Sequence, residues 1–452
     1  MSLFWLKKIV LLFVMIFMFH LPVPLIAAVS NMLNMNTEEL LAIQENPDWK
    51  IVDCRINDAF NGWKIDGVKQ GGHIPGATDF SANWLKVDDK DKEQTLKEAL
   101  AVKGITNEKN IILYDANGRD AVEVAEYLKT QSYGNLYYYN INLWPVEKPL
   151  RRYENYHLIV PAVIVHDIIE GKIPETFPAD KKIKIVEASW GEEKTSYAKG
   201  HIPTSFHINT DNVEPPTTTE PVMWMLADDD TLAEFALKFG FTRNDVVIVT
   251  GEEQMAAYRI ALVLRYIGVE DVRVLNGGTL AWTLAGYQLE KKNNRPSPEV
   301  AFGGQIPGDP SVIDTIEQVK SGLETSATYT LVDNRTWDEH IGKISGYSYH
   351  EKKGRIPGSV FGYAGKTDAY SLDYFRNPDK TMRNASEIMA LWKDQGIDTS
   401  KRLAFMCGSG WRAAEVYYYA DVYGLKNIGV YSDGWIGWSN GGNIVETGEP
   451  KK

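Results

Sequence analysis

A cysteine that opens a glycine-rich turn is the segment of this sequence best suited to nucleophilic chemistry. Cys407 begins the run Cys-Gly-Ser-Gly-Trp-Arg, which ends at Arg412. Gly408 and Gly410 allow the chain to turn so that consecutive backbone N–H groups point at one sulfur atom, and a helix that starts there adds the positive end of its dipole. Both effects stabilise a thiolate, which is the nucleophilic form of cysteine. The sequence therefore predicts covalent catalysis at Cys407.

Two arginines are candidate ligands for an anionic substrate. Arg412 closes the Cys407 loop, and Arg335 stands two residues after Asp333 at the end of an apolar run. A guanidinium group presents several N–H donors to an anion. We expect both arginines at the rim of the Cys407 pocket, where they would make the mouth of an acidic protein locally positive.

The segments that lead to Cys407 have counterparts in two other parts of the chain. Each copy has a short apolar run with an acid, then a turn with glycine and proline, then a second apolar run of four residues. These elements are residues 51–55, 72–77 and 111–114 in the first copy, 185–189, 200–205 and 246–249 in the second, and 331–335, 354–359 and 403–406 in the third. Short, unbroken apolar runs are typical of buried strands in a parallel sheet.

Each copy continues with a helical pattern. Apolar or small residues follow the second run at positions i, i+3, i+4 and i+7, which indicates a helix with one buried face. They are Ala121, Val124, Ala125 and Leu128, then Ala257, Ile260, Ala261 and Leu264, then Ala413, Val416, Tyr417 and Ala420. With a closing strand, this order predicts an α/β fold of three tandem domains, each an open, mostly parallel sheet flanked by helices. We place the domains at residues 30–150, 151–298 and 299–452.

The acid-x-Arg strand end, the Gly-x-Ile-Pro-Gly turn and the Cys407 loop resemble the rhodanese (sulfurtransferase) family, in the form of three tandem modules of the exported type. The resemblance covers nearly the whole chain after residue 29. It implies that Cys407 takes the outer sulfur of a donor as a persulfide, which the loop amides cradle, and passes it to a thiophilic acceptor such as cyanide or a thiol. It implies no metal and no organic cofactor.

The resemblance also assigns roles within each domain. It implies that Arg412 and Arg335 bind the donor anion and that the backbone N–H groups of the loop donate hydrogen bonds to the persulfide. The loop residues are Gly408, Ser409, Gly410 and Trp411. Asp115 and Thr250 stand where the first and second domains would need the cysteine. Because neither side chain can carry a persulfide, we expect those two domains to be inactive and to serve as scaffold or pocket walls.

The choice of donor and the alternative functions rest on the same loop. The charge of Arg412 favours thiosulfate, while the otherwise uncharged loop resembles that of 3-mercaptopyruvate sulfurtransferases, which makes mercaptopyruvate the second choice. An alternative is a carrier that delivers the Cys407 sulfur to a protein partner. A phosphatase or arsenate reductase is disfavoured, because a loop that rings an oxyanion has five residues between cysteine and arginine, and this loop has four.

Composition excludes several other classes of protein. The chain has 452 residues, with 48 Lys and Arg against 60 Asp and Glu, and the net charge of -12 disfavours a nucleic-acid partner. Its two cysteines, Cys54 and Cys407, are too few for a disulfide framework or a four-thiolate zinc site. We expect Cys54, in the middle of a strand, to be structural.

The N-terminal segment has the order of a secretory signal. Lys7 and Lys8 precede an apolar run at residues 9–19, and small residues follow at Ala27 and Ala28. We expect a signal peptide at residues 1–29 and an exported protein, periplasmic or extracellular. If the segment is not cleaved, it would anchor the chain in the membrane, and it is the one membrane contact that we predict.

Overall fold

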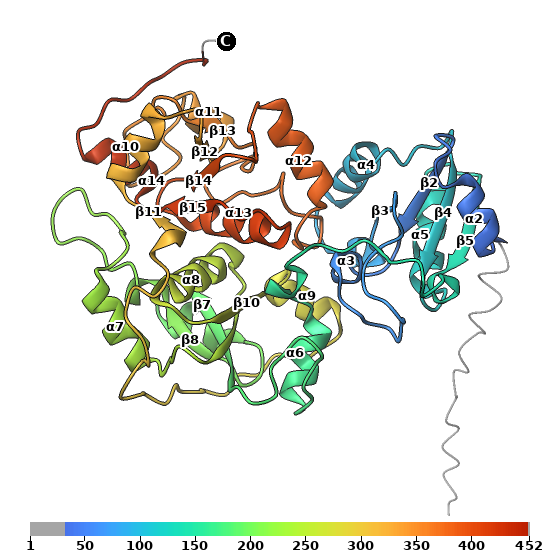
Figure 1. Ribbon diagram of the computed structural model, residues 1–452, viewed down its shortest axis with the longest axis horizontal. Helices are drawn as coiled ribbons and strands as arrows, with labels where there is room; N and C mark the ends of the chain where they lie inside the picture. Colours follow the sequence, from blue (N-terminus) through green and yellow to red (C-terminus); the bar gives the residue numbers. More distant parts are fainter. Residues whose placement is uncertain (1–31, 451–452) are drawn as a thin grey trace, which may run out of the picture.

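The structure is a computed structural model that describes residues 32–450 (Figure 1). The predicted signal peptide at residues 1–29 lies outside these residues. Within residues 32–450, no helix is both long enough and apolar enough to cross a membrane.

Three five-stranded parallel sheets follow one another along the chain, as the sequence pattern predicts. All three have the same strand order, with the first strand in sequence at one edge, the third at the other, and the fifth, fourth and second between them. The first is β1 (Leu33–Asn34), β5 (Leu136–Asn140), β4 (Asn110–Asp115), β2 (Trp49–Asp53) and β3 (Thr78–Asp79). The second is β6 (Ile159–Val160), β10 (Asp271–Leu275), β9 (Val246–Thr250), β7 (Ile183–Ser189) and β8 (Phe206–Asn209). The third is β11 (Ile313–Asp314), β15 (Ile428–Tyr431), β14 (Arg402–Met406), β12 (Tyr329–Asp333) and β13 (Val360–Phe361).

Helices flank each sheet, which confirms the predicted fold class of three tandem α/β domains. The first domain has α2 (Thr37–Ile43), α3 (Asn57–Asn61), α4 (Lys92–Val102) and α5 (Arg119–Thr130). The second has α6 (Ala162–Ile169), α7 (Asp229–Lys238), α8 (Gln254–Ile267) and α9 (Gly278–Leu284). The third has α10 (Ile316–Glu324), α11 (Trp337–His340), α12 (Ala385–Asp394), α13 (Trp411–Val422) and α14 (Gly434–Asn440). The helices predicted after the second apolar runs are α5, α8 and α13, and their expected apolar faces are buried.

The second and third domains share one hydrophobic core. Helices α8 and α13 pack against each other between the two sheets (Figure 1). The ring of Tyr258 on α8 lies 5.5 Å from the rings of both Tyr418 and Tyr419 on α13. The buried cluster around these rings runs through both domains and includes Cys407. The catalytic candidate is therefore built into a two-domain unit.

The first domain has its own cores and meets the others at smaller contacts. It lies beside the two-domain unit in Figure 1, with α3 and α4 turned toward it. Trp63 packs in the core of the second domain and donates its indole N–H to the carbonyl oxygen of Ile159 at 2.8 Å. The predicted domain borders, 150/151 and 298/299, fall in segments between the sheets and remain predictions.

Candidate active site

Cys407 lies at the carboxyl end of β14, immediately before the turn into α13. Its side chain is 1% exposed, and Sγ accepts a hydrogen bond from the backbone N–H of Gly410 at 3.2 Å. Gly410 has φ +97°, a left-handed conformation that glycine adopts without steric cost. The glycine at the last turn position is therefore what lets the amide face the sulfur.

A tyrosine that the sequence analysis missed covers the other side of the loop. A Cβ atom on Gly408 would overlap the hydroxyl group of Tyr347, so glycine permits this close approach. The Tyr347 hydroxyl accepts a hydrogen bond from Arg412 Nη2 at 3.0 Å. Burial raises the pKa of Tyr347, so its hydroxyl stays protonated and can donate toward the loop. Tyr347 belongs to an irregular segment after α11, where no periodic pattern marks it.

Arg412 is buried and paired rather than placed at an open rim. Its side chain is 1% exposed, and Nη1 and Nη2 each donate to a carboxylate oxygen of Glu339 at 2.9 Å. Although burial acts in the opposite direction, the charge and hydrogen bonds of Arg412 hold the pKa of Glu339 below its usual value. The pair is ionised and close to neutral overall.

Arg335 is also fully buried, and it contacts its own strand end. Nε and Nη2 donate to the two carboxylate oxygens of Asp333 at 2.9 and 2.7 Å, and Nη2 also donates to the carbonyl oxygen of Gly354 at 2.8 Å. The expectation that both arginines form an exposed positive rim is therefore wrong. A buried guanidinium needs a carboxylate partner, and Asp333 and Glu339 lie within reach.

The remaining loop residues point in different directions. Ser409 is half-buried at the top of the loop. The Trp411 indole N–H donates to Glu214 Oε2 at 2.6 Å, and Glu214 belongs to the second domain. The second domain thus forms one wall of the site, although its own loop lacks a cysteine.

Aromatic rings surround the approach to the Cys407 loop. The ring of Tyr349 lies 5.4 Å from the ring of Tyr347 and 5.4 Å from the ring of Trp224, a residue of the second domain. Trp190 continues the group at 6.4 Å from Trp224. Trp190 and Tyr349 are 59% and 40% exposed. The approach is therefore aromatic, and the nearby Glu214 is buried in an ion pair with Arg259.

The corresponding loops of the other domains hold polar side chains. Asp115 accepts hydrogen bonds from the N–H groups of Gly118 at 2.6 Å and Ala121 at 2.8 Å. In the second domain, Glu187 pairs in register with Thr250, and burial raises the pKa of Glu187 to about 8. The hydroxyl of Thr250 and one oxygen of Glu187 are buried without a hydrogen-bond partner in the described part of the chain.

Cys54 has a different environment from Cys407. It is fully buried on the strand end of the first domain, and burial together with the charges of Asp115 and Asp53 raises the pKa of its thiol. Such a thiol is a poor nucleophile. Neither cysteine is in a disulfide.

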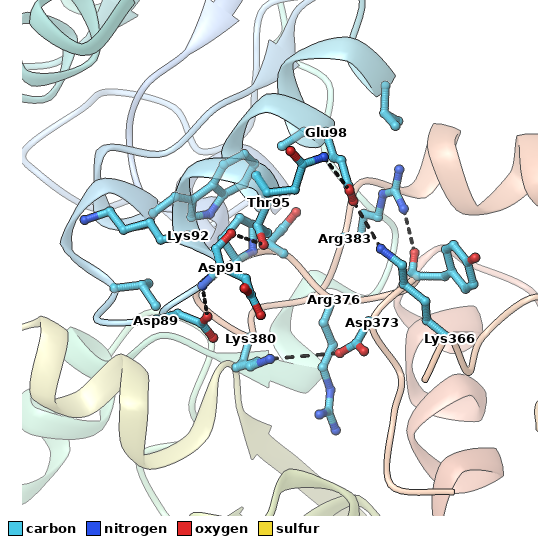
Figure 2. Close-up of a pocket in the computed structure, with 18 of the residues that line it drawn as sticks. Asp89, Asp91, Lys92, Thr95, Glu98, Lys366, Asp373, Arg376, Lys380 and Arg383 are labelled. Carbon is cyan, nitrogen blue, oxygen red and sulfur yellow. Dashed lines mark hydrogen bonds and ion pairs between the residues drawn. The ribbon is translucent and has the colours of Figure 1, made fainter. Parts of the chain in front are cut away.

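A separate cavity of about 470 Å³ lies between the first and third domains (Figure 2). Charged side chains of opposite sign meet in and around it, among them Lys366 with Glu98 at 3.1 Å and Lys380 with Asp373 at 4.0 Å. Arg376, in its wall, pairs at 2.6 Å with Glu415 of α13. Since the Cys407 loop does not line the cavity, we assign it to the contact between these domains.

Comparison with known proteins places the three domains in one family. The description Rhodanese-like domain matches residues 36–141, 176–285 and 315–441. Among curated proteins, the chain is 35% identical over 404 residues to thiosulfate sulfurtransferase YnjE of Escherichia coli (strain K12), covering 88% of this chain and 89% of that protein. It is 27% identical over 269 residues to human 3-mercaptopyruvate sulfurtransferase, covering 58% of this chain and 86% of that protein.

Solved structures of the enzyme EanB are similar over nearly the whole chain. The complex of an EanB variant with ergothioneine has a TM-score of 0.85 and 33% identity, and the match covers 93% of this chain and 100% of that chain. The anaerobic ergothioneine biosynthesis enzyme from Chlorobium limicola, in complex with its natural substrate trimethyl histidine, gives the same values. Another EanB structure contains a cysteine persulfide with ergothioneine in a tetrahedral intermediate state.

Proposed function

The chain belongs to the rhodanese family of sulfurtransferases, and we propose that it moves a sulfane sulfur from thiosulfate, through a persulfide on Cys407, to cyanide or a small thiol. 3-Mercaptopyruvate is the second candidate donor. The observation that carries the proposal is the Cys407 loop, in which a buried sulfur accepts the Gly410 N–H at the start of a helix.

The proposed reaction has two steps. The Cys407 thiolate attacks the outer sulfur of thiosulfate, a new S–S bond forms, and sulfite leaves with the electron pair of the broken bond. Cyanide then attacks the outer sulfur of the persulfide and leaves as thiocyanate, which returns Cys407 to the thiolate. The Gly410 N–H, which faces the sulfur, and the protonated Tyr347 hydroxyl, which lies against Gly408, are donors available to the negative charge that resides on sulfur between the steps.

The paired arginines limit how the donor binds. Glu339 and Asp333 already neutralise Arg412 and Arg335, so a dianionic donor meets little net charge from them. Within residues 32–450, Arg412 Nε and Arg335 Nη1 are buried without a hydrogen-bond partner, so each guanidinium group keeps one donor for a ligand. We therefore expect a high KM for thiosulfate and a weak dependence of KM on ionic strength.

Mass spectrometry of the intact chain tests the proposal. Incubation with thiosulfate should add the mass of one sulfur atom to the peptide that contains Cys407, and cyanide should remove it as thiocyanate. Side-by-side kcat/KM values for thiosulfate and mercaptopyruvate identify the donor. Loading from neither donor, or loading of the Cys54 peptide instead, would overturn the proposal.

A second candidate acceptor is a betaine such as hercynine, because the approach to Cys407 is aromatic. A quaternary ammonium group binds against aromatic faces, and Tyr349, Trp224 and Trp190 supply such faces. EanB, for which complexes with hercynine are known, supports this candidate. Persulfide-loaded protein should then convert hercynine in a single turnover, and Trp224→Ala should raise the hercynine KM while the cyanide KM stays unchanged.

A third candidate acceptor is a protein partner, and the reaction of persulfide-loaded protein with small acceptors tests it. If the loaded persulfide is stable to cyanide, thiols and hercynine, the carrier function is favoured over small-molecule turnover.

We also propose that the protein is exported and needs neither a metal nor an organic cofactor. The support for export is the order of Lys7, Lys8 and the apolar run at residues 9–19. Cell fractionation and the N-terminal mass of the mature chain test it, and a full-length chain retained in the cytoplasm would contradict it. Turnover that survives dialysis against a chelator tests the independence from metals.

A further inference from the structure

The second domain places a buried ion pair against the catalytic loop of the third. Arg259 on α8 donates from Nε to Glu214 Oε1 at 2.8 Å, and the two side chains are 0% and 2% exposed. Both residues belong to the domain whose own loop carries Thr250 in place of a cysteine.

This pair contacts the Cys407 loop directly on two sides. Glu214 Oε2 accepts the indole N–H of Trp411 at 2.6 Å. A Cβ atom on Gly410 would lie 2.8 Å from Arg259 Nη1, so the guanidinium packs against the very residue whose N–H faces Cys407 Sγ. Arg259 Nη2 donates to Ser432 Oγ at 2.6 Å, just beyond β15. The loop is therefore enclosed between the guanidinium and its own strand.

One donor of Arg259 is left over. Within the described residues, Nη1 is buried and has no hydrogen-bond partner. A buried donor without a partner on a charged group lowers the stability of the fold. If this position served the domain contact alone, an apolar side chain would fill it without that loss of stability. The unpaired atom lies against Gly410, at the place a side chain of that residue would occupy.

We propose that Arg259 is a positioning residue for sulfur transfer at Cys407: together with Glu214 it holds Gly410 and Trp411 so that the Gly410 N–H stays aimed at the sulfur. The inference rests on the proposed persulfide chemistry of Cys407. It makes the second domain, which lacks a nucleophile, a working part of the site.

Arg265 is the matched control for this role. It lies on the same helix, faces the same domain contact, and pairs with Asp421 of α13 at 2.7 Å. Six residues of helix separate it from Arg259, about 9 Å along the axis. Replacing Arg265 weakens the contact between the domains without touching the loop.

Amide hydrogen exchange and steady-state kinetics of the full chain test the proposal together. In Arg259→Met, a peptide spanning residues 408–412 should exchange faster, and kcat should fall by roughly 10-fold to 100-fold with little change in KM. In Arg265→Met, exchange in this peptide and kcat should match the wild type. Arg259→Lys, which retains the charge, should recover part of kcat.

The outcomes separate this inference from the proposed function. If the wild type carries no persulfide on Cys407, the proposed function fails. If the wild type loads sulfur but Arg259→Met and Arg265→Met have the same kcat and the same loop exchange, the positioning role is overturned. Should Arg259→Met not fold, Glu214→Gln replaces it; this variant keeps an acceptor for Trp411 but removes the charge beside Arg259, and an unchanged kcat would then overturn the proposal.

Discussion

The first and third domains share a buried arginine clamp, although one of them has a cysteine in its loop and the other does not. Arg55 donates to Asp53 at 2.9 and 2.6 Å and to the carbonyl oxygen of Gly72 at 2.7 Å. In the third domain, Arg335 makes the same three contacts to Asp333 and Gly354, at 2.9, 2.7 and 2.8 Å. The clamp joins the strand end to the glycine-proline turn in both domains, and it forms in the first domain without a cysteine in the loop.

The two loops differ in the atom that their amides face. In the first domain, the carboxylate of Asp115 accepts the N–H groups of Gly118 and Ala121. In the third, the sulfur of Cys407 accepts the N–H of Gly410. The turn thus presents its N–H groups to an acceptor in both domains, and these groups and the helix dipole favour an anion there. In the first domain the side chain of Asp115 fills this place, whereas in the third it is the sulfur of Cys407, to which the proposed reaction adds a sulfane sulfur.

The second domain shows what happens when the clamp is lost. Ser189 stands where the other domains have arginine, so Glu187 has no cationic partner, and burial raises its pKa to about 8. In the third domain, Arg335 and His340 outweigh burial and lower the pKa of Asp333. One residue on the strand therefore decides whether the neighbouring acid is neutral or charged.

The largest expected effect on turnover comes from replacing Cys407, the residue that distinguishes the loop of the third domain from the other two. Cys407→Ser should abolish both sulfur loading and turnover, because a hydroxyl group cannot hold a sulfane sulfur under these conditions. Intact mass and the thiocyanate assay measure the two losses. Cys54→Ser is the control and should load sulfur as the wild type does; turnover that persists in Cys407→Ser would contradict the assignment of the active domain.

The next effect tests the close approach of Tyr347. The first domain has Ala116 where the third has Gly408, so alanine fits the turn itself. In Gly408→Ala the new methyl group would displace Tyr347, and kcat/KM should fall by about 100-fold. Steady-state kinetics measure this loss. Gly118→Ala, a change in the inactive loop, should leave kcat/KM unaltered, and an equal loss in both variants would show that the effect is on folding.

Removing either clamp arginine should cost stability to a similar degree. Arg55→Met and Arg335→Met each remove the guanidinium group from a buried carboxylate, which keeps the Tyr114 hydroxyl in the first domain and His340 in the third, and each should lower the free energy of unfolding by about 3 kcal/mol. Urea denaturation measures the loss. If the clamp is structural, the folded fraction of Arg335→Met should keep its turnover within about threefold of the wild type. A much larger loss of turnover in this variant would return Arg335 to the substrate-binding residues.

The unpaired acid of the second domain predicts a dependence of stability on pH. The folded-state pKa of Glu187 is raised to about 8 from a usual value of 4.5, so its contribution is complete below about pH 4.5 and is lost as the pH rises through 8. Glu187→Gln, which stays neutral, should therefore be more stable than the wild type at pH 9, by about 2 to 4 kcal/mol, and equal to it near pH 5. Melting temperatures across this range measure the difference; a constant difference would contradict the raised pKa.

The smallest effect on turnover is expected from replacing Asp115, in the loop of the first domain. Asp115→Ala removes an acceptor for three backbone N–H groups and for the Tyr138 hydroxyl, and should cost about 1 to 3 kcal/mol of stability. Turnover should stay within about twofold of the wild type, because we expect the first domain to be inactive. Thiocyanate formation by the purified variant measures this, and a large loss would mean that the first domain contributes to catalysis.

Local patterns in the sequence predicted the fold well. The apolar runs at residues 111–114, 246–249 and 403–406 lie in β4, β9 and β14, and the helices follow where the 3.6-residue period indicates them. Such signals depend on neighbours a few residues apart. The prediction that Arg335 and Arg412 form a positive rim was wrong, because both side chains are buried and paired with Asp333 and Glu339. Arg412 and Glu339 are 73 positions apart in the sequence.

The sequence by itself determined that three similar α/β domains follow one another and that the Cys407 loop belongs to the last, because strand length, helix period and turn glycines are local properties of the chain. Tertiary structure decided which side chains share the site. Tyr347 and Glu214 contact the loop although they lie 60 and 193 positions before Cys407. Arg259 contacts it from 151 positions before Gly410. No local pattern encodes such contacts: Tyr347 meets the loop through the fold of the third domain, and Glu214 and Arg259 meet it only when the second and third domains pack around one core.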